Sequence, residues 1–163
     1  MCANNQSIVT SFLRNQKINE FNKWRIENLI FKLNLNGTDL SNLDLSGTFL
    51  NGVSCVGCNF TKSNLCRANL VQSDLSKTNF ENSNLTSALM MYSDLSTCNM
   101  SHADLTGTNL MWSNLSHSDL SYCNLTSTIL VEANLSHANF IGVDMTSAFL
   151  KYAKMDNLKK VIA

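Results

Sequence analysis

The sequence predicts an all-β solenoid, a chain that turns a corner every five residues and stacks one coil on the next. Every residue whose number is a multiple of five, from Leu35 to Met155, is large and apolar except Cys55. The residue two places earlier is small throughout, apart from Leu33 and Leu43. This period fits neither the roughly 3.6 residues of a helical turn nor the alternation of an ordinary strand. Both residues should therefore point inward, with coils stacked about 4.8 Å apart like other β-ladders.

The repeat unit reads small residue, Asn or Asp, Leu or Phe, Ser or Thr, then a variable residue. It resembles the A(D/N)LxX unit of the pentapeptide repeat family. Three segments match that unit directly: Ala68-Asn69-Leu70, Ala103-Asp104-Leu105 and Ala133-Asn134-Leu135-Ser136. The resemblance implies a right-handed quadrilateral parallel β-helix with one pentapeptide per side and four per coil. On that geometry residues 33–155 form the solenoid, in about six coils whose two ends need caps.

Residues 1–32 precede the regular repeat and predict an N-terminal α-helical cap with a lead-in strand. Residues 5–28 read as one helix or a pair, and residues 29–35 alternate like a strand. The apolar stripes at helical spacing are Ile8, Phe12 and Leu13, then Ile18, Phe21 and Trp24. Covering the exposed end of the solenoid is the expected role, because an uncapped end promotes aggregation. A helix that binds a partner or a membrane surface is the alternative.

Residues 156–163 break the repeat and predict a short C-terminal cap. Leu158, Val161 and Ile162 have the spacing of one helical turn. A cap this short leaves the last coil partly open, which would allow end-to-end dimerisation.

The charge and the N-terminal sequence favour a cytoplasmic protein, and the family resemblance implies a bacterial one. The 163 residues include 12 Lys or Arg and 12 Asp or Glu, so nothing in the net charge favours direct nucleic-acid binding or an anionic membrane. No apolar run approaches the about 18 residues of a membrane span. The first residues lack the pattern of a signal peptide, and cysteines at inward positions fit a reducing compartment. A role as a secreted effector stays open.

Few residues suggest chemistry, and we expect no catalytic residue, no cofactor and no small-molecule substrate. The carboxylates are scattered, and the serines have no base behind them. Cys55 and Cys58 have the spacing of a metal or redox motif, but the repeat turns both inward and no second pair occurs. His117 and His137 are one coil apart and should stack at a corner, with a weak metal site as the alternative. All six glycines fall in that corner slot, where a positive φ is useful.

One side of the predicted rod differs from the other three. Apolar residues replace Asn or Asp at spacings that are all multiples of one four-sided coil, and further apolar residues follow them on the same side. This predicted interaction face consists of Phe49, Val71, Leu89, Met91, Tyr92, Met111, Trp112, Ile129, Val131, Phe149 and Tyr152. A contiguous patch rich in Met, Trp and Tyr is typical of an interface. Its expected occupant is a second copy, another protein, or the N-terminal helices of this chain.

The sequence therefore favours a non-catalytic scaffold that acts by protein–protein recognition, with a foreign partner or as a homodimer. The alternative is a DNA mimic that binds a type II topoisomerase, since some pentapeptide repeat proteins resemble B-form DNA, bind gyrase and protect it from quinolones. Such proteins have strongly acidic surfaces, and usually a loop insertion or a C-terminal dimer module. Here as many basic as acidic residues are present, and no loop interrupts the register. An enzyme is the least favoured class.

Overall fold

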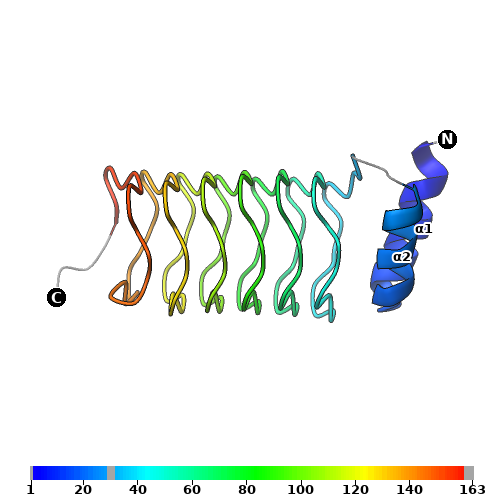
Figure 1. Cartoon of the computed structure of the whole chain (residues 1–163), viewed down its shortest axis with the longest axis horizontal. Coiled ribbons are helices and arrows are strands. Elements are labelled where there is room, and N and C mark those ends of the chain that lie inside the picture. Colours follow the sequence, from blue (N-terminus) through cyan, green and yellow to red (C-terminus); the bar gives the residue numbers. More distant parts are fainter. Residues whose placement is uncertain (1, 29–31, 160–163) are drawn as a thin grey trace.

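The fold is a rod of stacked coils with two helices at one end. The computed structural model describes residues 2–28 and 32–159. Helices α1 (Cys2–Arg14) and α2 (Ile18–Asn28) come first. From Asn34 onward the described chain alternates two-residue turns with single parallel bridges, except at Asp144, which forms no bridge. Figure 1 shows both helices across one end of the rod and the last coil at the other.

Each coil has four sides of five residues. Bridge partners lie twenty residues apart along the rod, from Asn34 with Ser54 to Asn139 with Lys159, and the pairing is parallel. Backbone hydrogen bonds accompany the bridges; the Leu65 amide, for example, donates to the Asn84 carbonyl at 2.7 Å. A twenty-residue coil with a corner every five residues is the solenoid that the sequence period predicts. The right hand of the coil stays a prediction.

Each corner is a tight turn that contains a residue with positive φ. The Thr38 amide donates to the Leu35 carbonyl at 2.9 Å, and Gly37 inside this turn has a φ of 65°. The left-handed region favours glycine, and all six glycines adopt positive φ, as the sequence predicts. Other corners hold larger residues in the same conformation, such as Lys62 with a φ of 57°. Since a Cβ at Gly37 would have no neighbour within 4 Å, the corner leaves steric room for a side chain.

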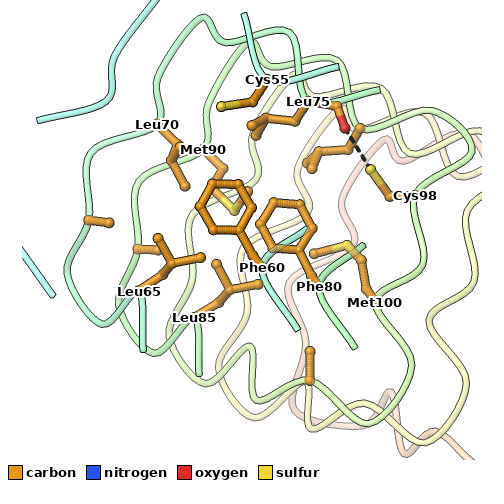
Figure 2. Packing of buried hydrophobic residues seen from close by; sticks show 14 of the residues in the cluster. Cys55, Phe60, Leu65, Leu70, Leu75, Phe80, Leu85, Met90, Cys98 and Met100 are labelled. Carbon is orange, nitrogen blue, oxygen red and sulfur yellow. Dashed lines mark hydrogen bonds between the residues drawn. The ribbon is translucent and has the colours of Figure 1, made fainter. Parts of the chain in front are cut away.

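The inward residues of successive coils fill the rod. Phe60 and Phe80 are fully buried one coil apart, and their ring centroids stack at 5.2 Å (Figure 2). The small inward residue often carries a donor, as at Cys98, whose Sγ donates to the Leu75 carbonyl at 2.9 Å. Buried polar groups with a hydrogen-bond partner add little desolvation penalty. The large and small positions of the repeat therefore form one continuous core.

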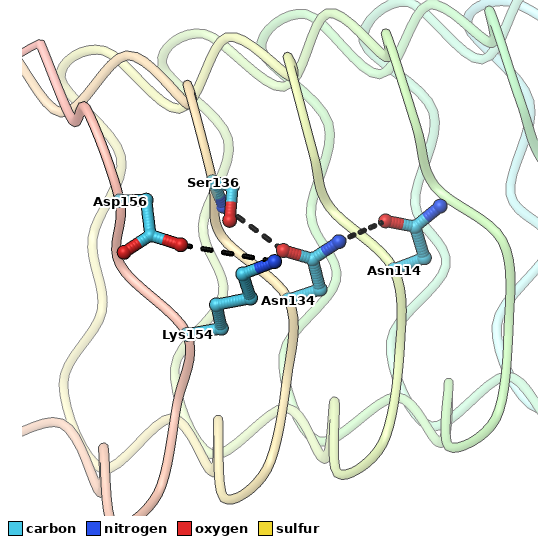
Figure 3. A network of polar contacts seen from close by, with 5 residues as sticks. All are labelled: Asn114, Asn134, Ser136, Lys154 and Asp156. Atoms are coloured by element: carbon cyan, nitrogen blue, oxygen red, sulfur yellow. Dashed lines mark hydrogen bonds and ion pairs between the residues drawn. The ribbon is translucent and has the colours of Figure 1, made fainter.

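Asn and Asp side chains form a second ladder on the outside of the rod. Asn134 Oδ1 accepts a hydrogen bond from the Ser136 amide at 3.1 Å, and its Nδ2 donates to Asn114 Oδ1 at 3.1 Å (Figure 3). The first bond fixes the local turn and the second joins neighbouring coils. At the end of this ladder Lys154 and Asp156 form an exposed ion pair at 3.7 Å. This double role explains why the repeat prefers Asn or Asp in this slot.

Helices α1 and α2 pack against the first coil with part of the predicted apolar stripes. Leu13 and Phe21 are fully buried. Partly buried residues from the two helices complete the contact: Phe12, Ile18 and Trp24. Ile8 is 39% exposed and does not contribute as the sequence predicts, whereas its neighbour Val9 is buried. Of the predicted lead-in strand, residues 29–31 lie outside the described part, and only Asn34 forms a bridge.

Side chains of α2 pair with the backbone edge of the first coil. Asn22 Nδ2 donates to the Gly47 carbonyl at 2.9 Å, and its Oδ1 accepts from the Phe49 amide at 2.8 Å. Arg25 Nε donates to the Phe49 carbonyl at 3.2 Å, and one of its terminal nitrogens donates to the Asn51 carbonyl at 2.6 Å. In the next coil, the groups equivalent to the Phe49 amide and to the Phe49 and Asn51 carbonyls bond to the preceding coil, and buried backbone groups need such partners. Asn22 and Arg25 thus replace a missing coil.

The repeat continues past the predicted boundary at Met155. Lys159 forms a bridge with Asn139, and the Phe140 amide donates to the Lys159 carbonyl at 2.6 Å. Residues 156–159 therefore form another side of the coil, which corrects the predicted start of the C-terminal cap. Val161 and Ile162, which complete the predicted helical turn, lie outside the described residues. Met155, an inward position of the last coil, is 42% exposed.

We expect Arg25→Ala to lower the free energy of unfolding by about 2–4 kcal/mol, because carbonyls of the coil edge lose a charged donor. Urea denaturation followed by circular dichroism measures this change. Lys17→Ala, at an exposed position between the helices, is the matched control and should stay within about 0.5 kcal/mol of the unmodified protein. An equal effect of the two substitutions would show that Arg25 does not stabilise the coil edge.

Candidate interaction surface

The predicted interaction face occupies one side of the rod. Parallel bridges link one column along this side: Phe49, Asn69, Leu89, Asn109, Ile129 and Phe149. Each of these residues precedes an inward residue, which is buried except for the partly buried Leu150, and the residue after the inward position forms a second column. The apolar members of the second column are Val71, Met91, Met111 and Val131. The structure therefore places the predicted residues on one surface, as the multiples of twenty in their numbering indicate.

This face is accessible to solvent in the described chain. The most exposed members are Tyr152 at 74%, Phe149 at 56% and Tyr92 at 54%. Phe49, Leu89 and Trp112 are also exposed, and the remaining apolar members are half-buried. Large side chains exposed in adjacent rows form a contiguous apolar surface, unlike the isolated exposed residues that most proteins carry.

The corner beside this face carries a column of stacked aromatic side chains. The rings of Tyr92 and Trp112 stack with centroids 4.8 Å apart and planes 9° from parallel. Glu132 and Tyr152 occupy the same corner in the next two coils, and all four residues have φ between 57° and 62°. Lys151 Nζ lies 4.9 Å from the Tyr152 ring centroid, the distance of a cation–π contact. Identical backbone geometry therefore directs aromatic and acidic side chains to one edge.

The N-terminal helices do not lie along this face. They lie across the end of the rod (Figure 1), and α2 bonds to the backbone of the first coil between Gly47 and Asn51. Beyond Phe49, which is itself 38% exposed, the apolar members lie in later coils. Of the occupants considered from the sequence, this chain's own helices are therefore not the cover.

The cysteine motif lies inside the rod. Cys55 and Cys58 are both buried, and Cys58 Sγ donates to the Leu35 carbonyl at 2.9 Å. The pKa of the Cys55 thiol is raised well above its usual range. The main cause is a hydrogen bond with Cys58, and the second is burial. Within residues 2–28 and 32–159, no group of three His, Cys, Asp or Glu side chains is placed to hold a metal ion.

The predicted pairing of His117 with His137 is confirmed. Their rings stack with centroids 4.6 Å apart and planes 3° from parallel. The structure adds a further corner stack that sequence reasoning missed, between His102 and Tyr122 with ring centroids 5.0 Å apart. The same signal, two ring-bearing residues twenty positions apart in the corner slot, would have identified it. Tyr122 also covers Gly142 of the next coil, where an added Cβ would lie 2.4 Å from the tyrosine ring.

A rod built from four five-residue sides per coil, with Leu or Phe inward and Asn or Asp outward, defines a pentapeptide-repeat solenoid. The family model for pentapeptide repeats matches this chain in 8 copies over residues 54–90, 93–130 and 118–157. The chain therefore belongs to the pentapeptide repeat family. A comparison with curated proteins gave no significant match.

Several solved pentapeptide repeat proteins are similar to this chain. Rfr23 from the cyanobacterium Cyanothece 51142 is 26% identical, with 86% of this chain and 97% of that chain covered and a TM-score of 0.49. HetL, a protein involved in heterocyst differentiation regulation in Nostoc sp. strain PCC 7120, is 24% identical over 74% and 73% of the two chains, with a TM-score of 0.28. Full-length QnrB1, a plasmid-mediated fluoroquinolone resistance protein, is 20% identical over 80% and 84%, with a TM-score of 0.32.

The helical part of the chain gives one further finding on location. Neither described helix is long and apolar enough to cross a membrane.

We expect buried and outer cysteines to differ in reactivity towards a thiol reagent at pH 8. In a Cys2→Ser background, half-exposed Cys66 should react fast, while Cys98 and Cys123 react only after unfolding, because burial raises the pKa of each to about 12. Cys66→Ser should remove the fast phase, and Cys123→Ser should leave it unchanged. Fast labelling of Cys98 or Cys123 in the folded protein would contradict the buried geometry.

The same raised pKa values make stability depend on alkaline pH. A thiol in the unfolded chain has a pKa of about 9.0, so the unfolded chain loses these protons first. The protonated Cys98 and Cys123 thiols therefore contribute fully to the free energy of unfolding below about pH 9. This contribution declines as the pH rises towards about 12. In a Cys98→Ala, Cys123→Ala variant this decline should be shallower.

Proposed function

We propose that this chain is a non-catalytic scaffold that acts by protein–protein recognition through its apolar face. The proposal rests on one observation: in the Asn or Asp slot, large apolar residues occur on a single side of the rod, where Phe49, Leu89 and Phe149 are exposed. Exposed patches of this kind mark interaction sites. The proposal includes a cytoplasmic location, and it includes no cofactor, no small-molecule substrate and no direct nucleic-acid binding.

The composition of the face supports this proposal. Trp, Tyr and Met are enriched at the centres of interfaces, where they exclude water and contribute most of the binding energy. Tyr92, Trp112, Met91 and Met111 lie in two adjacent coils near the middle of the rod. These central residues are the ones that a partner would cover first.

The rigidity of the rod supports it as well. The backbone of each middle coil is hydrogen-bonded to the coils on both sides, and the inward residues are fully buried. Such a backbone has little conformational freedom to lose when a partner binds, which raises affinity. The face is therefore preorganised for recognition.

Site-specific photo-crosslinking in the cell of origin tests the proposal. Benzoylphenylalanine in place of Leu89 should form a protein adduct, because this position lies in the middle of the face. The matched control is Asn79, which occupies the same slot on the opposite side of the rod. The mass of the purified adduct separates a second copy of this chain from a foreign protein. Equal adducts from both positions, or none from position 89, would refute the proposed face.

A type II topoisomerase is a second candidate partner, which the charge distribution along the rod favours. Residues 78–150 contain no Lys or Arg, and their acidic residues are Glu81, Asp94, Asp104, Asp119, Glu132 and Asp144. The zero net charge therefore combines a central segment of formal charge −6 with basic ends. Such a belt attracts basic surfaces that bind DNA.

A gyrase supercoiling assay in the presence of a quinolone tests this second candidate. The unmodified protein should restore supercoiling. A variant with Asp94, Asp104, Asp119 and Asp144 changed to Asn should restore much less, because most of the central charge is gone. No effect of the unmodified protein would eliminate the candidate.

A further inference from the structure

The apolar face lies between acidic residues. Asp94 follows Tyr92 by two positions on the adjoining side of the rod, and Asp104 lies on the side before the face. Glu132 occupies the corner column of the face itself, between the coils of Trp112 and Tyr152. Carboxylates thus border the central part of the face on both flanks and at its corner.

Glu132 has one basic neighbour, Lys151, whose carbonyl accepts from the Glu132 amide at 3.0 Å, whereas Asp94 and Asp104 have none in the segment around them. Lys and Arg are absent from residues 78–150, which form the central and later coils. In the described chain the salt bridges join Lys23 with Glu27 and Lys154 with Asp156, and both lie outside that segment. Negative potential therefore surrounds the middle of the apolar face, within about a Debye length of 8–10 Å at physiological salt.

The corner column offers a place for a cation. Tyr92 stacks on one face of the Trp112 ring, and the coil of Glu132 follows Trp112 on the other side. Tyr152 comes one coil further and already holds the Lys151 ammonium against its ring. Aromatic rings and a carboxylate in one column attract an ammonium or guanidinium group by cation–π and ionic contacts.

We propose that the face binds a basic amphipathic segment of a protein partner. Its apolar side chains would lie on Leu89, Met111 and Ile129, and one of its Lys or Arg side chains would lie over Glu132 between the two rings. This inference rests on the proposed function and adds the chemistry of the partner. Charge complementarity selects such a segment over a second copy, since two copies facing each other would bring two acidic belts together.

The length of the face sets the length of the segment. The bridged column from Phe49 to Phe149 crosses six coils, which corresponds to about 24 Å at the usual spacing of paired strands. A helix of about 16 residues spans that distance. An amphipathic helix lying along a groove or face is a common recognition mode.

Fluorescence anisotropy with two labelled model peptides of about 16 residues tests this inference. Both peptides carry Leu at helical spacing, and their polar positions are Lys and Arg in one and Glu in the other. The intact protein should bind the basic peptide at least ten-fold more tightly than the acidic one. Equal binding of the two peptides would overturn the inference.

Matched variants assign the discrimination to the face. A triple variant removes three charges around the face: Asp94→Asn, Asp104→Asn and Glu132→Gln. It should bind the basic peptide less than three-fold more tightly than the acidic one. The control removes the same number from the opposite side: Asp39→Asn, Glu81→Gln with Asp119→Asn. Asn occurs at the equivalent places of other coils, such as Asn114 and Asn59, so the outer ladder should be preserved. Equal losses in the two variants would overturn the inference.

A neutral variant of the face separates this inference from the proposed function. Leu89→Asn with Trp112→Ser places residues typical of the repeat at both positions and should abolish binding of both peptides. If the intact protein binds both peptides equally and this variant binds neither, the inference fails and the proposed face stands. If the variant binds like the intact protein, both fail. A stable dimer in light scattering that the basic peptide does not dissociate would assign the face to a second copy.

Discussion

The structure depends on one constraint, the parallel pairing of each side with the side twenty residues further on. This pairing fixes the coil length, and the coil length fixes which residues lie in one column. Inward positions then meet inward positions of the next coil, as Phe60 meets Phe80. The same register brings Tyr92 onto Trp112 and His117 onto His137 at the surface. Core packing and surface pattern are therefore two results of one backbone register.

The five positions of the repeat have different structural roles, and these roles limit which positions are available for a function. The small and large inward residues are committed to the core, and the Asn or Asp slot is largely committed to the outer ladder, as Asn134 shows. A Ser or Thr after the large residue donates to the ladder side chain in several coils, as Thr106 Oγ1 does to Asp104 Oδ1 at 2.6 Å, so the corner side chain is the one least committed to the repeat. Apolar residues in the ladder slot, such as Leu89, give up its hydrogen bonds. A residue that loses these hydrogen bonds without stabilising the fold in another way is the kind expected at a functional surface.

The sequence predicts the regular part of this fold because a period of five can be counted directly. It also locates the apolar face, since Phe49, Leu89 and Trp112 differ in number by values that map to one side. It does not predict that Arg25 bonds to the edge of the first coil, because that contact depends on how α2 is oriented. The extension of the repeat to Lys159 was missed for a related reason: backbone pairing with Asn139 maintains the coil where the side-chain pattern ends.

The four-sided coil also limits how such a chain changes length. Gain or loss of twenty residues adds or removes one complete coil and leaves every later residue on its original side. Gain or loss of five residues preserves the core pattern but rotates all later residues by a quarter turn. Such a change between Tyr92 and Trp112 would separate their rings and divide the apolar surface between two sides. The apolar surface therefore tolerates insertions and deletions only in units of twenty residues, whereas the core tolerates units of five.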